Sequence, residues 1–236
     1  MRETLSLQSM DDGYRALVIG ASGALGTAFC ELLREDPRCI AVRELGRGSL
    51  PRLDLEDPPT IAQAAAELSV EAPYQLILHS AGLLHRSGVQ PEKCLAAIEA
   101  DALQAVFQVN AIGPALLLRH FLPLLHARGA MALLSAKVGS IGDNRLGGWY
   151  AYRASKAALN MLVKTAAIEL ARQRPQARLL SLHPGTVISK LSEPFRGAAL
   201  ARPARQAAAD LLDLIDCLGP AESGGFFAYD GERLPW

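Results

Sequence analysis

The chain has 236 residues with 24 basic and 24 acidic side chains, so its formal net charge is zero. Nothing in this balance suggests nucleic acid or an anionic membrane as a partner, and we expect neither. Half of the residues are apolar, which suffices for a large buried core, yet no uncharged apolar run reaches the roughly 18 residues of a membrane helix.

Predicted strands and helices alternate along the chain. The expected strands cover residues 15–20, 39–45, 50–55, 74–79, 130–135, 178–183 and 225–229. The expected helices cover residues 25–35, 60–68, 105–127, 151–174 and 204–218. Continuous apolar strands between helices indicate a parallel sheet that helices cover on both faces. We therefore expect an α/β fold, a Rossmann-type doubly wound parallel sheet of about seven strands, in a single domain over residues 14–236 after a flexible tail over residues 1–13.

A glycine-rich segment joins the first expected strand to the first helix. Gly20, Gly23 and Gly26 are spaced so that the chain can turn tightly and a phosphate can approach the backbone. The free N–H groups at the helix start would then face a pyrophosphate. Alone, such a turn is a weak signal, because ordinary strand-to-helix turns also use glycine. Its position after the first strand of an α/β chain favours a dinucleotide site.

A tyrosine and a lysine lie four residues apart in a predicted helix, so they share a face. A lysine cation lowers the pKa of a neighbouring phenol from about 10, which would make Tyr152 beside Lys156 a usable acid or base near neutral pH. An isolated pair of this kind is more often a half-buried aromatic and a solvated charge. Tyr150 is a competing acid, but it lies six residues from Lys156 and off that face.

These motifs, in this order and spacing, resemble the short-chain dehydrogenase/reductase superfamily over roughly residues 15–230. The glycine-rich turn of that family is matched by Gly20, Ala24 and Gly26, and its Tyr-x-x-x-Lys pair by Tyr152 and Lys156. Four further motifs have counterparts: His79-Ser80-Ala81-Gly82, Asp54 in Leu53-Asp-Leu55, Asn110 in the long helix, and Pro184-Gly185-Thr186-Val187-Ile188-Ser189.

The resemblance implies an NAD(P)(H)-dependent oxidoreductase that interconverts a small-molecule carbonyl and an alcohol by hydride transfer, with Tyr152 as general acid or base. It implies that Lys156 binds the nicotinamide ribose and lowers the pKa of Tyr152, and that Asn110 holds a relay water. Val187 would fix the carboxamide through its backbone, with Ser189 assisting. The implied cofactor-binding residues are Gly20, Ser22, Gly23, Ala24, Leu25, Gly26, Arg47, Asp54, Leu55, Ser80, Ala81, Gly82, Tyr152, Lys156, Pro184, Gly185, Val187 and Ser189.

The sequence departs from the family pattern at the catalytic serine. Ala136 occupies that position, and the stretch from there to Tyr152 is about three residues longer than the common form, which Asp143-Asn144-Arg145 fills. Our hypothesis is that Ser135 or Asn144 donates to the substrate oxygen instead, so Ser135 is a catalytic candidate. Ser135 reaches the site only if the strand has ended, since consecutive strand residues face opposite sides. Alternatively, Asp143 and Arg145 only brace the loop with a salt bridge.

A finer resemblance, over residues 138–150, 225–231 and 234–236, is to the C-factor-like (C-signal-like) subgroup, some of whose members are linked to cell–cell signalling. Together with Ala136, it keeps open a cofactor-binding signalling or regulatory protein with little turnover. A metal-dependent hydrolase is disfavoured, because no Gly-x-Ser-x-Gly motif or ligand cluster occurs. Substrate specificity in the family depends on the loop that corresponds to about residues 190–202.

The choice of cofactor depends on the end of the second strand. Counting from Gly20 without gaps places Glu44 there, and an acidic residue binds the ribose 2′-hydroxyl of NAD. Arg38 and Cys39 indicate a lengthened turn before this strand, and the strand then ends at residues 46–47, where Arg47 reaches a 2′-phosphate. Arg43 is a second candidate for that contact. We therefore expect NADP(H) rather than NAD(H).

Three further expectations concern metals, location and assembly. The five histidines show no metal-ligand spacing, so no metal is expected. The four widely spaced cysteines favour a reducing, cytoplasmic location over a disulfide framework. The resemblance also implies a homo-oligomer, dimer or tetramer, built on the long helices that contain Asn110 and Lys156.

Overall fold

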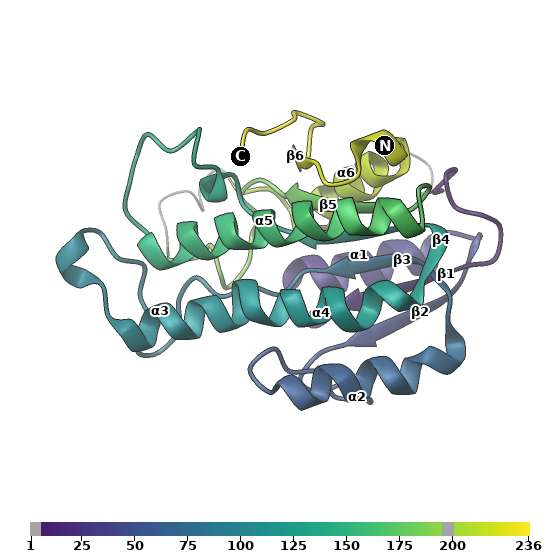
Figure 1. The fold of residues 1–236 in the computed structure, drawn as a ribbon, viewed down its shortest axis with the longest axis horizontal. Coiled ribbons are helices and arrows are strands. Elements are labelled where there is room, and N and C mark those ends of the chain that lie inside the picture. Colours follow the sequence, from purple (N-terminus) through teal and green to yellow (C-terminus); the bar gives the residue numbers. More distant parts are fainter. Residues whose placement is uncertain (1–5, 195–200) are drawn as a thin grey trace.

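The computed structural model describes residues 6–194 and 201–236. Its centre is a six-stranded sheet in which every strand runs parallel to its neighbours, in the order β2-β1-β3-β4-β5-β6 (Figure 1). The strands are β1 (Tyr14–Ile19), β2 (Cys39–Leu45), β3 (Tyr74–His79), β4 (Leu125–Leu134), β5 (Arg178–His183) and β6 (Phe226–Ala228).

The register of the central strands brings their carboxyl ends to one level. Ile19, the last residue of β1, pairs with Leu45 at the end of β2 and with His79 at the end of β3. The strand order reverses between β1 and β3, and in such sheets ligands bind beyond the carboxyl ends at that switch point. The loops that follow these three strands therefore meet where a dinucleotide site is expected.

Helices cover both faces of the sheet. They are α1 (Ala24–Glu35), α2 (Pro58–Leu68), α3 (Ala100–Phe107), α4 (Gly113–Phe121), α5 (Tyr150–Gln173) and α6 (Ala204–Cys217). In β1, Leu17 and Ile19 face the core beneath α2, α4 and α5, whereas Ala16 and Val18 face the core beneath α1 and α6. Helices α4 and α5 lie side by side in Figure 1. The predicted doubly wound parallel sheet is thus confirmed.

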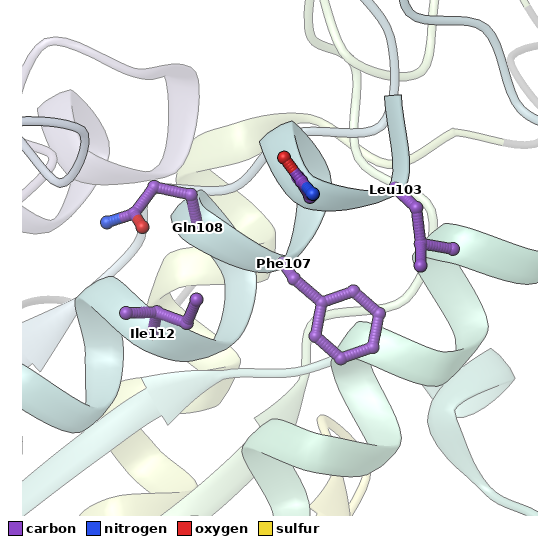
Figure 2. A pocket seen from close by; sticks show the side chains of 5 residues that line it. Leu103, Phe107, Gln108 and Ile112 are labelled. Carbon is purple, nitrogen blue, oxygen red and sulfur yellow. The ribbon is translucent and has the colours of Figure 1, made fainter. Parts of the chain in front are cut away.

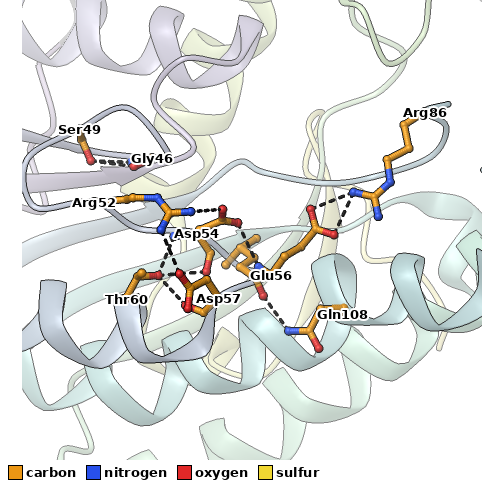
Figure 3. A network of polar contacts seen from close by, with 10 residues as sticks. Gly46, Ser49, Arg52, Asp54, Glu56, Asp57, Thr60, Arg86 and Gln108 are labelled. Carbon is orange, nitrogen blue, oxygen red and sulfur yellow. Dashed lines mark hydrogen bonds and ion pairs between the residues drawn. The ribbon is translucent and has the colours of Figure 1, made fainter.

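The strand predicted over residues 50–55 is wrong, and the described sheet has six strands rather than about seven. The segment is a loop between β2 and α2, in which Pro51 has no N–H to donate to a ladder. Arg52 instead forms ion pairs with Asp54 at 2.7 Å and Asp57 at 2.9 Å (Figure 3). Leu53 and Leu55 are both buried in the core, which explains the alternating pattern that imitated a strand.

The helix predicted over residues 105–127 begins earlier, at Ala100, and ends earlier, at Phe121. It runs through a π-helical turn, Gln108–Ile112, before α4 begins. A short 3₁₀ turn follows it, and there Arg174 donates to the Leu122 and Leu125 carbonyls at 3.0 and 2.5 Å. These bonds satisfy carbonyl groups that a longer helix would have paired internally.

Residues 6–13 of the expected flexible tail are instead packed against the domain, and residues 1–5 lie outside the described part of the chain. Leu7 and Met10 are buried in the core beneath α1 and α6. The guanidinium of Arg38 donates to both of their carbonyls at 2.6 Å, and Asp36 accepts from the Leu7 N–H at 3.0 Å. Because most residues of this segment are polar, the sequence did not indicate that Leu7 and Met10 would be buried.

Candidate active site

The glycine-rich turn leads from β1 into α1 and leaves no room for a Cβ at Gly20 or Gly26. Gly20 has a φ of +85°, and a Cβ there would lie 2.7 Å from the Ala81 nitrogen. A Cβ at Gly26 would overlap the Gly20 oxygen. Gly23 precedes α1, and no side chain caps that helix start. Its free N–H groups and the open backbone around them therefore fit the pyrophosphate of a dinucleotide.

The segment after β3 continues this cradle toward the predicted catalytic residues. The Ser80 hydroxyl donates to the Gly20 oxygen at 3.1 Å, which ties the segment to the glycine turn. A Cβ at Gly82 would lie 3.5 Å from the Asn110 Oδ1 and 3.6 Å from the Lys156 Nζ. The structure thus places the predicted cofactor residues after β1 and β3 beside two predicted catalytic residues.

Tyr152 and Lys156 lie in the first turns of α5, and both are buried. The Lys156 Nζ lies 5.8 Å from the centre of the Tyr152 ring, so the two side chains share a face, as their spacing predicts. The same Nζ donates to the Leu134 oxygen at 2.8 Å. Helix α5 therefore holds a phenol and an ammonium group together beside the cofactor cradle.

Burial controls the protonation of this pair. It raises the pKa of Tyr152 to about 12 and lowers the pKa of Lys156 to about 8. The expected lowering of the Tyr152 pKa by Lys156 is not found, because desolvation disfavours the charged forms of both groups. At neutral pH the Tyr152 phenol keeps its proton, as a proton donor to a carbonyl oxygen must.

Replacing Lys156 with methionine should change how stability depends on pH. The folded pKa of Lys156 lies near 8, below the ordinary 10.5, so between these values the unfolded chain binds more protons than the folded one. Stability of the wild type relative to Lys156→Met should therefore rise from about pH 8 to about pH 10.5 and be level below pH 8. Melting temperatures of both proteins without added cofactor test this, and a flat difference across that range would contradict it.

Asn110 lies in the π-helical turn and is fully buried. Its Oδ1 accepts from the Leu83 N–H at 2.8 Å, and its Nδ2 donates to the Leu83 oxygen at 2.7 Å and to the Ser155 hydroxyl at 3.1 Å. The side chain therefore holds the segment after β3 against α5. Its role with a relay water stays a prediction.

Ala136, and not Ser135, is the residue that lies beside Tyr152. Ala136 packs against Tyr152 and Leu84 in a small apolar cluster. Its backbone is extended, so the preceding Ser135 points to the opposite side of the chain. The Ser135 hydroxyl is buried there and has no hydrogen-bond partner among the described residues. The geometry therefore does not support Ser135 as the substitute donor.

The inserted residues lie in an exposed loop before α5. Asn144 accepts from the Gly147 N–H at 3.1 Å, which turns the loop back on itself. Over residues 6–194 and 201–236 no ion pair joins Asp143 to Arg145, so the bracing salt bridge does not form there. A donor role for Asn144 stays a prediction.

Two residues of the site, Glu92 and Trp149, are not among the site residues that the sequence predicted. Glu92 is buried, and its carboxylate accepts from the Ala151 N–H at 3.2 Å, at the start of α5. Its carbonyl accepts from the Trp149 N–H at 2.5 Å. Trp149 has a φ of +52°, and the two glycines before it are also left-handed. The pair Gly147-Gly148 is the sequence signal that could have indicated this unusual entry into the catalytic helix.

The segment after β5 closes the other side of the site. Gly185 has a φ of +73°, and a Cβ there would lie 3.0 Å from the Tyr229 ring. Val187 is buried, and its oxygen accepts from the hydroxyls of Ser189 at 3.2 Å and Ser192 at 2.5 Å. The contact of Val187 with a carboxamide stays a prediction. Of the expected specificity loop over residues 190–202, residues 195–200 lie outside the described part.

Asp54 and Leu55 lie in the loop between β2 and α2, beside the π-helical turn. The Asp54 carboxylate binds Arg52 and accepts from the Glu56 N–H at 3.1 Å, while Gln108 donates to the Leu55 oxygen at 2.7 Å (Figure 3). These bonds fix the loop after β2 against the helix that carries Asn110. A contact of Asp54 with the cofactor stays a prediction.

Comparison with known proteins identifies the class. The family described as enoyl-(acyl carrier protein) reductase matches residues 29–216. Over 187 residues, 79% of each chain, the protein is 32% identical to 1-hydroxy-2-glutathionyl-2-methyl-3-butene dehydrogenase of Rhodococcus sp. (strain AD45). The chain belongs to the short-chain dehydrogenase/reductase family of oxidoreductases.

Three further comparisons concern the subgroup and the fold. C-signal of Myxococcus xanthus is 37% identical over 159 residues, 65% of this chain and 91% of that protein, which confirms the C-factor-like resemblance. The carbonyl reductase Sniffer of D. melanogaster has the same fold, with a TM-score of 0.81 and 24% identity over 96% of this chain and 100% of that chain. A short-chain dehydrogenase/reductase from Burkholderia multivorans with bound NADP gives a TM-score of 0.78 and 25% identity over 94% and 99%.

Proposed function

We propose that this protein is a nicotinamide-dependent oxidoreductase that reduces a carbonyl to an alcohol, or runs the reverse reaction. The observation that carries the proposal is the buried, protonated phenol of Tyr152 beside Lys156, at the end of a cradle shaped for a dinucleotide. The cofactor would supply the hydride to the carbonyl carbon. Tyr152 would give its proton to the carbonyl oxygen. The protein would hold the hydride donor and the proton donor at the same carbonyl group.

Turnover against a panel of aldehydes and ketones tests this function. Purified protein with NADPH or NADH should oxidise the cofactor in proportion to the carbonyl added. The second candidate is a signalling or regulatory protein that binds the cofactor with little turnover, favoured by Ala136 beside Tyr152 and by the likeness to C-signal. Tight NADPH binding without turnover of any carbonyl would support that candidate instead.

Three features of the β2 end support NADP(H) as the cofactor. Glu44 lies within β2 and pairs with Arg34 of α1, so its carboxylate is already used. The strand ends at Leu45, and Arg47 follows as an exposed cation. A Cβ at Gly46 would lie 4.0 Å from the Ser22 hydroxyl, so the loop after β2 adjoins the glycine turn. A 2′-phosphate there would meet Arg47 and Ser22, while the Arg34 cation offsets the charge of Glu44.

Replacing Arg47 with alanine should weaken NADPH binding about tenfold, or about 1.4 kcal/mol, and leave NADH binding unchanged. The reason is that only NADPH carries the 2′-phosphate. Arg43→Ala is the matched control, because the Arg43 guanidinium is held by Glu71 at 2.6 Å. Fluorescence titration with both cofactors measures the effect. Equal losses for NADPH and NADH, or a loss confined to Arg43→Ala, would reject this assignment.

We also propose that the protein is a dimer or tetramer through the outer face of the long helices. A shallow hollow on that face is lined by Leu103, Gln104, Phe107, Gln108 and Ile112 (Figure 2). On α5, Met161 and Ile168 are 66% and 50% exposed. By length and composition the run Ala100–Leu124 could also cross a membrane, but 44% of its most apolar stretch is buried inside the protein. A second copy would cover the exposed apolar part.

Light scattering at micromolar concentration should give the mass of a dimer or tetramer. Ile112→Arg should give a folded monomer, because Ile112 is 47% exposed and an arginine there remains solvated only when the face is free. Val70→Arg, at an exposed site in the turn before β3, should keep the assembly. A monomeric mass for the wild type would refute the proposal.

A further inference from the structure

Five apolar side chains form one hydrophobic cluster with Tyr152, and we call them the apolar collar. They come from segments after β3, β4 and β5 and from the residue before α5. The members are Leu84, Ala136, Val138, Trp149 and Leu191. None of the five is charged, and Ala136 has no hydroxyl where the family has a serine. The apolar cluster that contains the proton donor therefore presents hydrocarbon and one indole ring.

Trp149 is held firmly for a loop residue. Its left-handed φ of +52° is strained for a tryptophan, and such strain persists only where surrounding contacts impose it. The Glu92 backbone carbonyl accepts from the Trp149 N–H at 2.5 Å, and the Glu92 carboxylate accepts from the Ala151 N–H at 3.2 Å. The Arg153 N–H donates to the Trp149 oxygen at 2.8 Å. The indole is thereby presented to the ring of Tyr152 edge-on, with centres 6.2 Å apart and planes at 79°.

The chain segments that carry the collar residues are joined by hydrogen bonds. The His85 Nε2 donates to the Lys190 oxygen at 3.1 Å, so the residue after Leu84 is joined to the residue before Leu191. Glu92, from the same segment as Leu84, holds Trp149. The apolar surfaces around Tyr152 are thus connected by hydrogen bonds outside the collar. Such a surface is largely formed before any substrate arrives, as binding sites for small molecules usually are.

We infer that the collar binds an uncharged, ring-sized hydrocarbon substituent of the substrate and places its carbonyl oxygen at the Tyr152 hydroxyl. The inference rests on the proposed function and names its substrate class. Apolar groups gain from leaving water for such a site, and an aromatic ring gains further from edge-to-face contact with Trp149. A carboxylate in the same place would lose its hydration without gaining a charged partner from the collar.

Two benzaldehydes, one without and one with a para-carboxylate, test the substrate class. With NADPH, wild-type kcat/KM should be at least about tenfold higher for benzaldehyde than for para-carboxybenzaldehyde. Acetaldehyde, which has no ring, should also be a poorer substrate than benzaldehyde. Equal or better use of para-carboxybenzaldehyde would overturn the inference while leaving the proposed function standing.

Trp149→Asn isolates the contribution of the indole. Asparagine tolerates a left-handed backbone, so the start of α5 is kept while the ring is removed. The ratio of kcat/KM for benzaldehyde over acetaldehyde should fall about tenfold, mainly through KM for benzaldehyde. Trp236→Asn is the matched control, since Trp236 lies outside the collar and stacks on Phe226. An unchanged ratio in Trp149→Asn would also overturn the inference.

Glu92 is a positioning residue in this scheme, and its conservative variant provides a rescue. Glu92→Ala removes only the carboxylate bond to the Ala151 N–H, because the Trp149 N–H is bound by the backbone carbonyl, and it should lower the benzaldehyde preference in part. Glu92→Gln keeps an acceptor for the Ala151 N–H and should keep that preference. If no aldehyde is turned over, calorimetry on Tyr152→Phe with NADPH decides between the two proposals. Binding of benzaldehyde but not of para-carboxybenzaldehyde would support the collar as a binding site and refute the proposed oxidoreductase activity. Binding of neither aldehyde would refute the collar as a binding site.

Discussion

Tyr152→Phe should lower kcat by about 10³-fold while leaving the affinity for NADPH and the melting temperature near wild type. The substitution removes the phenolic hydroxyl, which is the proton donor, and keeps the ring. Contacts of that ring with Ala136, Leu84 and Trp149 are therefore retained. Steady-state kinetics on the best carbonyl substrate, with NADPH binding measured by fluorescence, gives both numbers.

Tyr150→Phe is the matched control for this experiment. Tyr150 lies two residues earlier in α5 and is partly exposed, so loss of its hydroxyl should leave kcat within about twofold of wild type. A Tyr152→Phe protein that keeps near wild-type kcat would show that the catalytic assignment is wrong. A large fall in Tyr150→Phe alone would transfer the role to Tyr150.

The second large effect should come from Ala136→Ser, which we expect to raise kcat by about 10²-fold. Ala136 already packs against Tyr152, so a hydroxyl added there lies where it can donate to the same substrate oxygen. A donor aimed at charge that develops in the transition state stabilises it more than it stabilises the bound substrate. The measurement is kcat at saturating NADPH, with KM for the carbonyl determined separately.

Ser135→Ala and Asn144→Ala complete that experiment. Ser135 faces away from Tyr152, so its alanine variant should keep wild-type kcat. Asn144 lies in the exposed loop, and a fall in its variant would show that the loop supplies the missing donor. If Ala136→Ser gains nothing while Asn144→Ala loses activity, the native chain already holds a substitute. A strong gain in Ala136→Ser together with two unaffected alanine variants would describe a weakened enzyme and favour the signalling candidate.

The parts of the fold that could be predicted well are those whose signal is local. Strands Cys39–Leu45, Tyr74–His79 and Arg178–His183 match their expected bounds, because each is a compact run between polar or turn residues. The errors arise from distant partners. The end of α4 depends on Arg174, which lies 52 residues after the Leu122 carbonyl that it binds. The buried positions of Leu7 and Met10 likewise depend on Arg38.

The same distinction holds at the site. Gly20, Gly26, Tyr152 and Lys156 could be found from spacing, because their placement follows from helix geometry and from the absence of a side chain. Glu92 could not, since its place at the start of α5 depends on the path of a loop and on the left-handed backbone at Trp149. Nor could spacing show how burial shifts the pKa values of Tyr152 and Lys156, which depend on the whole surrounding core.

The π-helical turn at Gln108–Ile112 has a consequence for how this chain can change in length. Such a turn holds one residue more than an α-helical turn, so α3 and α4 keep different rotational phases about one axis. Deleting Ala111 would restore a uniform helix and rotate one half against the other by about 100°. Asn110 could not then reach Leu83 while Leu117 and Phe121 stay in the core. The number of residues in this helix is therefore constrained as tightly as their identity. The exposed loop before α5 does not fix the rotation of one helix half against another in this way.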